Sequence, residues 1–191
     1  MHASVVSPGR PLVLWVLFCL GCGGAPAPSV GDGGDSLGPG APPLATPAVS
    51  DRQARERGCA APAGEVREKV AVLVGIGAYE APLRPLQGPP FDVAAMADLL
   101  HRRFAFAADD ILTLKDGAAT RAGILKAMDE HLCARAGKGT VVVFYFSGHG
   151  SYLPDADGDE SDFYDETIVP YGPPGAPRSD ITDDTLGAIF D

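Results

Sequence analysis

The stretch Thr140–Gly150, TVVVFYFSGHG, decides the fold of this chain. Its residues Val141 to Phe146 form an unbroken run of β-branched and aromatic side chains, which predicts a strand buried on both faces. The run stops at SGHG, where two glycines permit a sharp turn and a close approach by a substrate. A histidine at the carboxyl end of a central parallel strand lies where α/β sheets bind ligands. The alternative is a surface histidine in a turn, but the flanking glycines and the acidic stretch that follows favour catalysis.

The segments before this stretch alternate between strand and helix patterns. Strands are predicted at Lys69–Gly77 and 110–115, and helices at 91–104 and 120–136, the second with Thr120 as its N-cap. The connections are long enough for crossovers, so the strands should be parallel and the helices should cover the sheet. The predicted fold class is therefore α/β, with an open, mainly parallel sheet and flanking helices. A further strand is expected at 167–169.

Length and charge limit the classes of partner that the chain could bind. The chain has 191 residues and a formal net charge of -10. This length suggests one domain with attachments, and the acidic balance argues against a nucleic-acid partner, which needs a basic patch. The balance suits basic ligands or cations. A dinucleotide-binding loop after the first strand is rejected, because Gly75 and Gly77 lack the third glycine of that motif.

The first 22 residues have the pattern of an export signal. Arg10 precedes the apolar run Leu12–Leu20, which is too short to span a bilayer as a mature helix. Leu20-Gly21-Cys22 resembles the end of a bacterial lipoprotein signal, with Cys22 as the acylated residue, although Cys19 stands where an aliphatic residue is usual. We therefore expect export to the periplasm, the outer membrane or the medium, with membrane contact only through a lipid anchor. Plain secretion is the alternative.

Residues 23–66 are rich in Gly, Pro, Ala and Ser and are predicted to form a flexible linker, which leaves residues 67–191 as the folded domain. Outside the signal, the cysteines are Cys59 and Cys133. In an oxidising compartment they could pair, and Cys133 could equally be a single buried thiol.

An acidic stretch follows the histidine. Asp155–Glu166, DADGDESDFYDE, contains seven carboxylates. Their spacing partly matches an EF-hand loop, but Glu160 replaces the required glycine and no helix precedes the loop. Calcium bound in another geometry is one interpretation, and a solvated acidic loop is the other. Asp183 and Asp184 begin a short apolar helix, where acids suit the first turn.

Several of these motifs together resemble a known family. They are VAVLVGIGAY, Leu86-Gln87-Gly88 with Asp92, FYFSGHG, DGDESDFYDETIVP and ITDD. From about Val70 to Asp191 the chain resembles the first part of the catalytic domain of the caspase-like cysteine peptidases, in particular the metacaspase branch of bacteria, plants and protists (peptidase family C14).

The resemblance implies roles for matching residues. His149 would be the general base of a Cys–His dyad, and Gly150 would offer a backbone N–H to the oxyanion. Asp92 and Ser147 would line a pocket for the Arg or Lys that precedes the cut bond. The pocket wall departs from the family, because PPF at 89–91 stands where Cys and Asn are frequent.

The resemblance also implies an activating calcium ion. Its ligands would be Asp183 and Asp184, completed by Asp165 or Asp162. The nucleophile itself is expected beyond residue 191, because in caspases it lies about 50 residues after the histidine. Neither Cys59 nor Cys133 suits that role, so this chain alone is expected to be inactive.

Two functional hypotheses follow. The first is a calcium-assisted cysteine endopeptidase that hydrolyses peptide bonds after Arg or Lys in protein substrates. The second is a non-catalytic, caspase-like pseudoenzyme that binds calcium or a partner protein. A nucleotide-dependent enzyme is disfavoured, because no phosphate-binding glycine loop precedes a helix.

Overall fold

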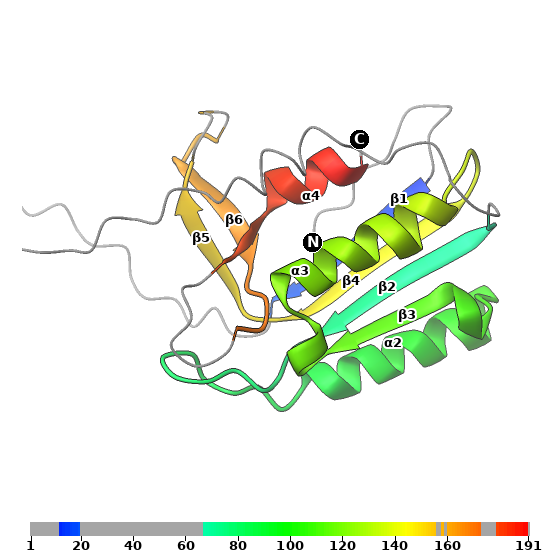
Figure 1. The fold of residues 1–191 in the computed structure, drawn as a ribbon, viewed down its shortest axis with the longest axis horizontal. Helices are drawn as coiled ribbons and strands as arrows, with labels where there is room; N and C mark the ends of the chain where they lie inside the picture. The colour runs from blue at the N-terminus through cyan, green and yellow to red at the C-terminus, as the bar shows by residue number, and fades with distance from the viewer. Residues whose placement is uncertain (1–11, 20–66, 156–157, 159, 173–178, 191) are drawn as a thin grey trace, which may run out of the picture.

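The computed structural model describes residues 12–19, 67–155, 158, 160–172 and 179–190 (Figure 1). Its main element is a parallel sheet with the strand order β1-β4-β2-β3. The strands are β1 (Leu12–Cys19), β2 (Lys69–Gly75), β3 (Ile111–Lys115) and β4 (Val141–Gly148). The predicted α/β class and the parallel pairing of β2, β3 and β4 are confirmed.

Helices cover both faces of this sheet (Figure 1). Helix α2 (Pro89–Phe104) packs on one face, and α3 (Arg121–Ala127) and α4 (Asp183–Phe190) lie on the other. Thr120 caps α3 as predicted, since its hydroxyl accepts the N–H of Gly123 at 3.1 Å. The helix predicted to run to residue 136 is less regular, because it continues as a π-helical turn and then a 3₁₀ turn that ends at Arg135.

The two faces of β2 and β4 belong to two separate cores. Alternate residues such as Val72, Val74 and Phe144 pack with α3 and α4. The residues between them, such as Leu73 and Tyr145, pack against α2. Because successive side chains point to opposite faces, a strand covered on both sides needs a continuous apolar run. This requirement explains why TVVVFYF was recognisable from the sequence.

A second, antiparallel sheet follows β4. It consists of β5 (Gly150–Pro154), β6 (Tyr164–Ile168) and β7 (Ile181–Thr182), with β6 in the middle. The further strand expected at 167–169 is therefore found in part as β6, but it belongs to this second sheet and does not extend the parallel one. The small sheet leaves Tyr152 and Tyr164 exposed, so its strands lack the apolar continuity that marks β2 and β4.

The backbone of β1 pairs with β4 from Leu12 to Cys19. These residues were interpreted as the apolar core of an export signal, and the same β-prone composition also suits an edge strand. Residues 1–11, Cys22 and the predicted linker at 23–66 lie outside the described residues. Among the residues that are described, no helix is long and apolar enough to cross a membrane.

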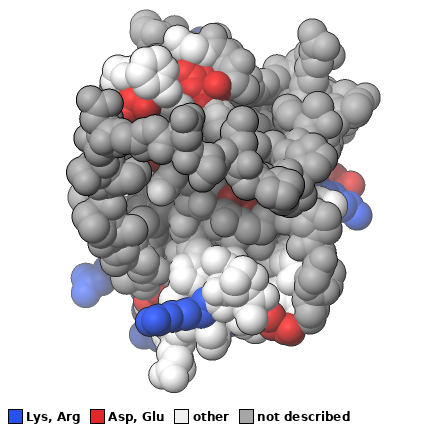
Figure 2. Space-filling model, turned by 90° about the vertical axis from the view of Figure 1, so that its left-hand side faces the viewer, with Lys and Arg blue, Asp and Glu red and all other residues white. Residues whose placement is uncertain are grey.

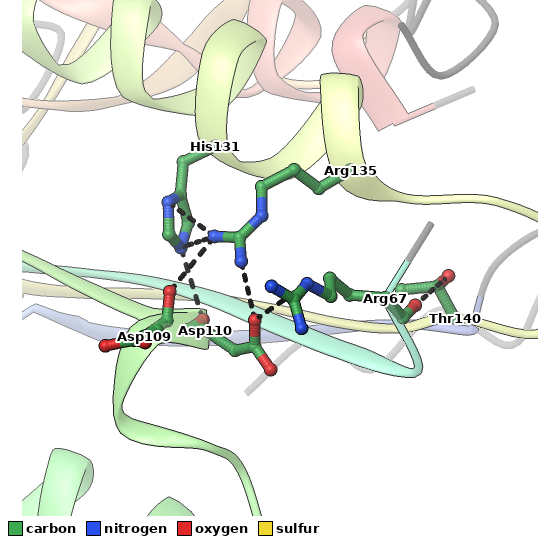
Figure 3. A network of polar contacts seen from close by, with 6 residues as sticks. All are labelled: Arg67, Asp109, Asp110, His131, Arg135 and Thr140. Atoms are coloured by element: carbon green, nitrogen blue, oxygen red, sulfur yellow. Dashed lines mark hydrogen bonds and ion pairs between the residues drawn. The ribbon is translucent and has the colours of Figure 1, made fainter. Parts of the chain in front are cut away.

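A network of polar contacts joins the amino ends of the strands (Figure 3). The buried Asp110 precedes β3, and its Oδ1 lies 2.6 Å from Nη2 of Arg135 and 3.7 Å from Nε of Arg67. His131 approaches the Asp110 carbonyl through Nε2 at 3.2 Å. Thr140, which precedes β4, donates its hydroxyl to the Arg67 carbonyl at 2.6 Å. The network therefore fastens the end of the sheet opposite to the predicted site.

Cys133 is disulfide-bonded. This finding excludes a single buried thiol at Cys133, and the predicted pairing with Cys59 stays a prediction. The side chains of the three other cysteines lie outside the described residues.

Candidate active site

His149 lies at the point where β4 passes into β5. Its ring is half-exposed at the carboxyl end of the parallel sheet, as the sequence predicts. Nε2 is 2.7 Å from the carbonyl oxygen of Arg84. A carbonyl oxygen only accepts, so Nε2 carries the proton in the neutral ring and Nδ1 is left as the acceptor. Nδ1 is therefore the nitrogen of the neutral imidazole that can accept a proton.

Tyr79 contacts His149 in two ways, through its hydroxyl and through its ring. Its hydroxyl donates to the carbonyl of Val169 at 2.7 Å and accepts the backbone N–H of His149 at 3.1 Å. Its ring centroid lies 4.6 Å from that of the imidazole, with the planes tilted by 55°. The sequence analysis did not identify Tyr79, because one tyrosine in a loop carries no signal of this contact.

The loop between β2 and α2 brings both Tyr79 and Arg84 to the histidine. Asp116, which follows β3, accepts the N–H groups of Gly77 and Ala78 at 2.8 and 2.9 Å. The N–H of Leu86 returns to the Gly77 carbonyl at 2.9 Å and closes the loop. Asp116 has φ of 42°. The sequence analysis also missed this residue, whose role depends on two strands meeting at one edge.

Gly150 opens β5 directly after the histidine. It is opposite Ile168 in β6, and the neighbouring pair is His149 and Val169, in which the Val169 N–H donates to the His149 carbonyl at 3.0 Å. Antiparallel pairs alternate between hydrogen-bonded and non-hydrogen-bonded positions. Gly150 therefore occupies a non-hydrogen-bonded position, and its N–H points away from β6 towards the outer edge of β5. This direction suits the oxyanion role that the resemblance implies.

The structure brings Asp92 and Ser147 together, as the predicted substrate pocket requires. The Ser147 hydroxyl donates to Oδ2 of Asp92 at 2.7 Å, and Ser147 is fully buried. Asp92 lies in the first turn of α2 and is half-buried. Burial raises the pKa of the adjacent Tyr145, and the negative charge of Asp92 raises it further, while a hydrogen bond with Ser147 opposes the shift.

A cluster of carboxylates lies on the antiparallel sheet. Single carboxylate oxygens of Glu160, Glu166 and Asp183 lie within 4.8 Å of one another, the only such group among the described residues. Burial raises the pKa of Asp183, and the nearby charges of Asp184 and Glu166 add to the shift. A divalent cation would relieve this repulsion, and hard carboxylate oxygens are the ligands that calcium prefers. Figure 2 shows carboxylates near the top of the face that carries this sheet.

This cluster differs from the predicted ligand set, of which it contains only Asp183. Asp162 is exposed and accepts the N–H of Tyr164 at 3.2 Å. Asp165 is buried, and Asp184 is half-buried in the first turn of α4. Because side chains alternate along β6, Asp165 and Glu166 point to opposite faces. Glu160 and Glu166 belong to the acidic stretch noted in the sequence, but they were not in the predicted ligand set.

Cys133 lies far from His149 and is not its nucleophile partner. Arg135 accepts the N–H of Arg67 on its carbonyl, just before β2 begins, so the turn that contains Cys133 lies at the amino ends of the strands. His149 lies at their carboxyl ends. Cys133 is moreover held in a disulfide. Its exclusion as nucleophile agrees with the sequence analysis.

Comparison with known proteins gives the family of this chain. The family described as "Metacaspase, peptidase C14 domain" matches residues 69–191. The chain is 36% identical over 126 residues to Metacaspase-1B of Aspergillus oryzae, and this alignment covers 63% of this chain and 29% of that protein. It is 37% identical over 128 residues to Metacaspase-1 of Meyerozyma guilliermondii, covering 64% and 30%. The chain thus spans less than a third of these relatives.

A parallel α/β sheet with a histidine at the end of its central strand is typical of the caspase-like cysteine peptidases. Within that class, the match over residues 69–191 is decisive, since it includes every element from β2 to α4. The chain belongs to the metacaspase family of C14 peptidases.

Proposed function

We propose that this chain supplies the base, oxyanion donor and substrate pocket of a cysteine endopeptidase that cuts after Arg or Lys. The single observation that carries the proposal is the half-exposed imidazole of His149, whose Nε2 is bound to the Arg84 carbonyl at 2.7 Å. This bond leaves Nδ1 as the proton acceptor. Family membership supports cysteine peptidase chemistry in general.

In the proposed reaction, Nδ1 of His149 takes the proton of a thiol, and the thiolate attacks the scissile carbonyl carbon. The resulting oxyanion receives the outward N–H of Gly150. The imidazolium then gives its proton to the leaving amine as the C–N bond breaks, which leaves a thioester. Water, deprotonated by the same Nδ1, hydrolyses this thioester to the free acid and returns the thiol. This proposal assigns the thiol to a cysteine outside the chain. Cys133 is disulfide-bonded at the opposite end of the sheet, and Cys19, whose backbone pairs with Gly148, belongs to the proposed export signal.

The preference for a basic residue rests on Asp92. Its carboxylate accepts one hydrogen bond from Ser147 at 2.7 Å, and a carboxylate has further lone pairs for a guanidinium or ammonium group. Replacement of Asp92 by Asn should therefore slow the hydrolysis of peptides with Arg before the cut bond far more than that of peptides with a neutral residue there.

Calcium assistance rests on the three carboxylates Glu160, Glu166 and Asp183. They would hold the ion, and the ion would supply positive charge that draws β6 and the start of α4 together. This ligand set replaces the one that the resemblance implied. We also propose export by residues 1–22 with acylation at Cys22, and labelling with a radioactive fatty acid tests it against a Cys22→Ser variant. Removal of the signal would take Leu12–Cys19 with it, so the processed form would keep the sheet β4-β2-β3 without β1.

The test of activity uses the longer polypeptide in which this chain is followed by its downstream coding sequence. An Arg-containing fluorogenic peptide should be hydrolysed in the presence of calcium, and His149→Ala should abolish hydrolysis. His101→Ala is the matched control, because His101 is exposed on α2. Hydrolysis that survives His149→Ala would contradict the proposal.

A second candidate function is a non-catalytic module that binds calcium or a protein partner. The disulfide at Cys133 favours it, since Cys133 is the one cysteine whose side chain the structure describes, and it is not a free thiol. Calcium binding measured by calorimetry, without turnover by the longer polypeptide, would support this second function.

A further inference from the structure

We propose that Tyr79 is the positioning residue of the histidine base, and that its hydroxyl is inserted as a spacer between β5 and β6. The proposal rests on the proposed peptidase function for its consequence in catalysis. The geometry itself stands without that function.

The spacer is seen in the hydrogen bonds of one residue pair. His149 and Val169 are opposite each other at the start of the β5–β6 ladder, and a regular pair in this position exchanges two backbone hydrogen bonds. One of them is present, from the Val169 N–H to the His149 carbonyl at 3.0 Å. In place of the other, the Tyr79 hydroxyl accepts the His149 N–H at 3.1 Å and donates to the Val169 carbonyl at 2.7 Å.

The inserted oxygen holds the pair apart on one side. A direct N–H···O=C bond spans about 2.9 Å between its heavy atoms, whereas two bonds in series through a hydroxyl need a wider separation. His149 is therefore displaced from the ladder towards the loop that carries Arg84. The displacement brings Nε2 to the Arg84 carbonyl at 2.7 Å.

Two further features support this arrangement of Tyr79 and His149. The Tyr79 ring packs against the imidazole at 4.6 Å and restricts its rotation. Gly148 makes room for the hydroxyl, since a Cβ on this residue would lie 2.6 Å from the Tyr79 oxygen. Tyr79 itself is 5% exposed, so its hydroxyl is held in place by the core rather than by solvent. The first glycine of SGHG is thus required by Tyr79.

The removal of one oxygen atom tests the proposal. In Tyr79→Phe the direct bond from the His149 N–H to the Val169 carbonyl should close, and the ring should leave Arg84. Spectra of the 191-residue chain labelled with ¹⁵N-histidine report this change, because the chain has four histidines and His149→Asn identifies the signal. We expect a single Nε2–H tautomer in the unaltered chain and a mixture of tautomers in Tyr79→Phe.

Tyr164→Phe is the matched control, since it also loses one phenolic hydroxyl and Tyr164 contacts the exposed Tyr152. It should leave the His149 signals unchanged.

A measurement on the unaltered chain tests the proposal even if Tyr79→Phe does not fold. In an equal mixture of H₂O and D₂O, the Tyr79 Cζ resonance should split in two, because a hydroxyl with both bonds made exchanges slowly.

In the longer polypeptide, Tyr79→Phe should lower kcat about 10- to 100-fold, as expected for a misplaced base, and leave KM unchanged. Unaltered His149 signals in Tyr79→Phe, or a single averaged Tyr79 resonance in the unaltered chain, would overturn the proposal. If the signals change as expected but the longer polypeptide hydrolyses no peptide, the peptidase function fails and the positioning role of Tyr79 stands.

Discussion

At the residue scale, the site depends on contacts that only a few side chains permit. Asp92 and Ser147 were predicted together and meet at 2.7 Å. Their strand and helix are recognisable in the sequence, and the pairing follows from the fold. Tyr79 and Asp116 were not predicted, because each acts on backbone groups from a distant segment. Backbone partners have no residue identity, so a sequence gives no signal for such contacts.

Gly148→Ala should destabilise the domain and disturb the histidine. The added Cβ would lie 2.6 Å from the Tyr79 hydroxyl and 2.7 Å from Cζ of Phe146, both buried. We expect a loss of about 1–3 kcal/mol in the free energy of unfolding, as for other overpacked cores. Denaturant unfolding measures this loss.

Gly187→Ala in α4 is the control for this substitution. A Cβ there meets no atom within 4 Å, so the variant should be as stable as the unaltered chain or slightly more stable. Equal stability of the two glycine variants would contradict the close approach of Tyr79.

At the scale of elements, the long buried strands were predictable and the small sheet was not. β2 and β4 are covered on both faces and therefore need continuous apolar runs. β6 buries only some of its residues and β5 buries none fully, so the sequences of both strands match a solvated loop equally well. The alternation of side chains along β6 places Glu166 on the face of the carboxylate cluster and Asp165 on the opposite face. This distinction requires knowledge of which face of β6 is turned towards Asp183.

Glu166→Gln should lower the pKa of Asp183 towards its ordinary value, because one of the negative charges that raise this pKa is removed. Calcium affinity should fall roughly tenfold, or about 1.4 kcal/mol. Carboxyl NMR titration measures the pKa, and calorimetry measures the affinity.

Asp162→Asn is the matched control, since Asp162 lies outside the cluster. A greater loss of calcium affinity in Asp162→Asn than in Glu166→Gln would show that the ion is bound by a different set of ligands.

The turn after α3 should make stability depend on pH. Burial lowers the pKa of His131, and Arg135 lowers it further, against the raising effects of the Asp110 carbonyl and carboxylate. Nη1 of Arg135 lies 3.0 Å from Nδ1 of His131, so protonation would place two cations in contact (Figure 3). The folded chain then binds fewer protons than the unfolded chain, and stability should fall as the pH drops below about 6.5.

Thermal unfolding between neutral pH and about pH 5.5 measures this dependence. His131→Gln should flatten the decline in Tm over this interval, and His101→Gln should retain it. A decline that persists unchanged in His131→Gln would assign it to other groups.

At the scale of the whole molecule, covalent and polar links hold the end of the sheet opposite to the histidine. The disulfide at Cys133 and the Asp110 network both lie there. The loops that surround His149 depend on hydrogen bonds between backbone and side chains instead. The sequence analysis predicted that His149 lies at the carboxyl end of the central strand, where the structure has it, but the disulfide was left open because pairing depends on three-dimensional proximity.

Cys133→Ser should lower the free energy of unfolding by about 2–4 kcal/mol under oxidising conditions, the usual effect of losing a disulfide. A reductant should bring the unaltered chain to the stability of the variant and leave the variant unchanged. Peptide mapping without reduction identifies the second cysteine. Indifference of the unaltered chain to reductant would contradict a stabilising role.

The place of β1 in the strand order has a consequence for the time at which the sheet is completed. Leu12 pairs with Val141, whereas β2 pairs with β3 across only 40 residues, from Ala71 to Ile111. Translation at about 5–20 residues per second separates the synthesis of β1 from that of its partner strand by roughly ten seconds. During this interval the apolar segment Leu12–Cys19 emerges from the ribosome with no β4 to pair with. Its apolar side chains therefore have no strand partner in the nascent chain until β4 has been synthesised.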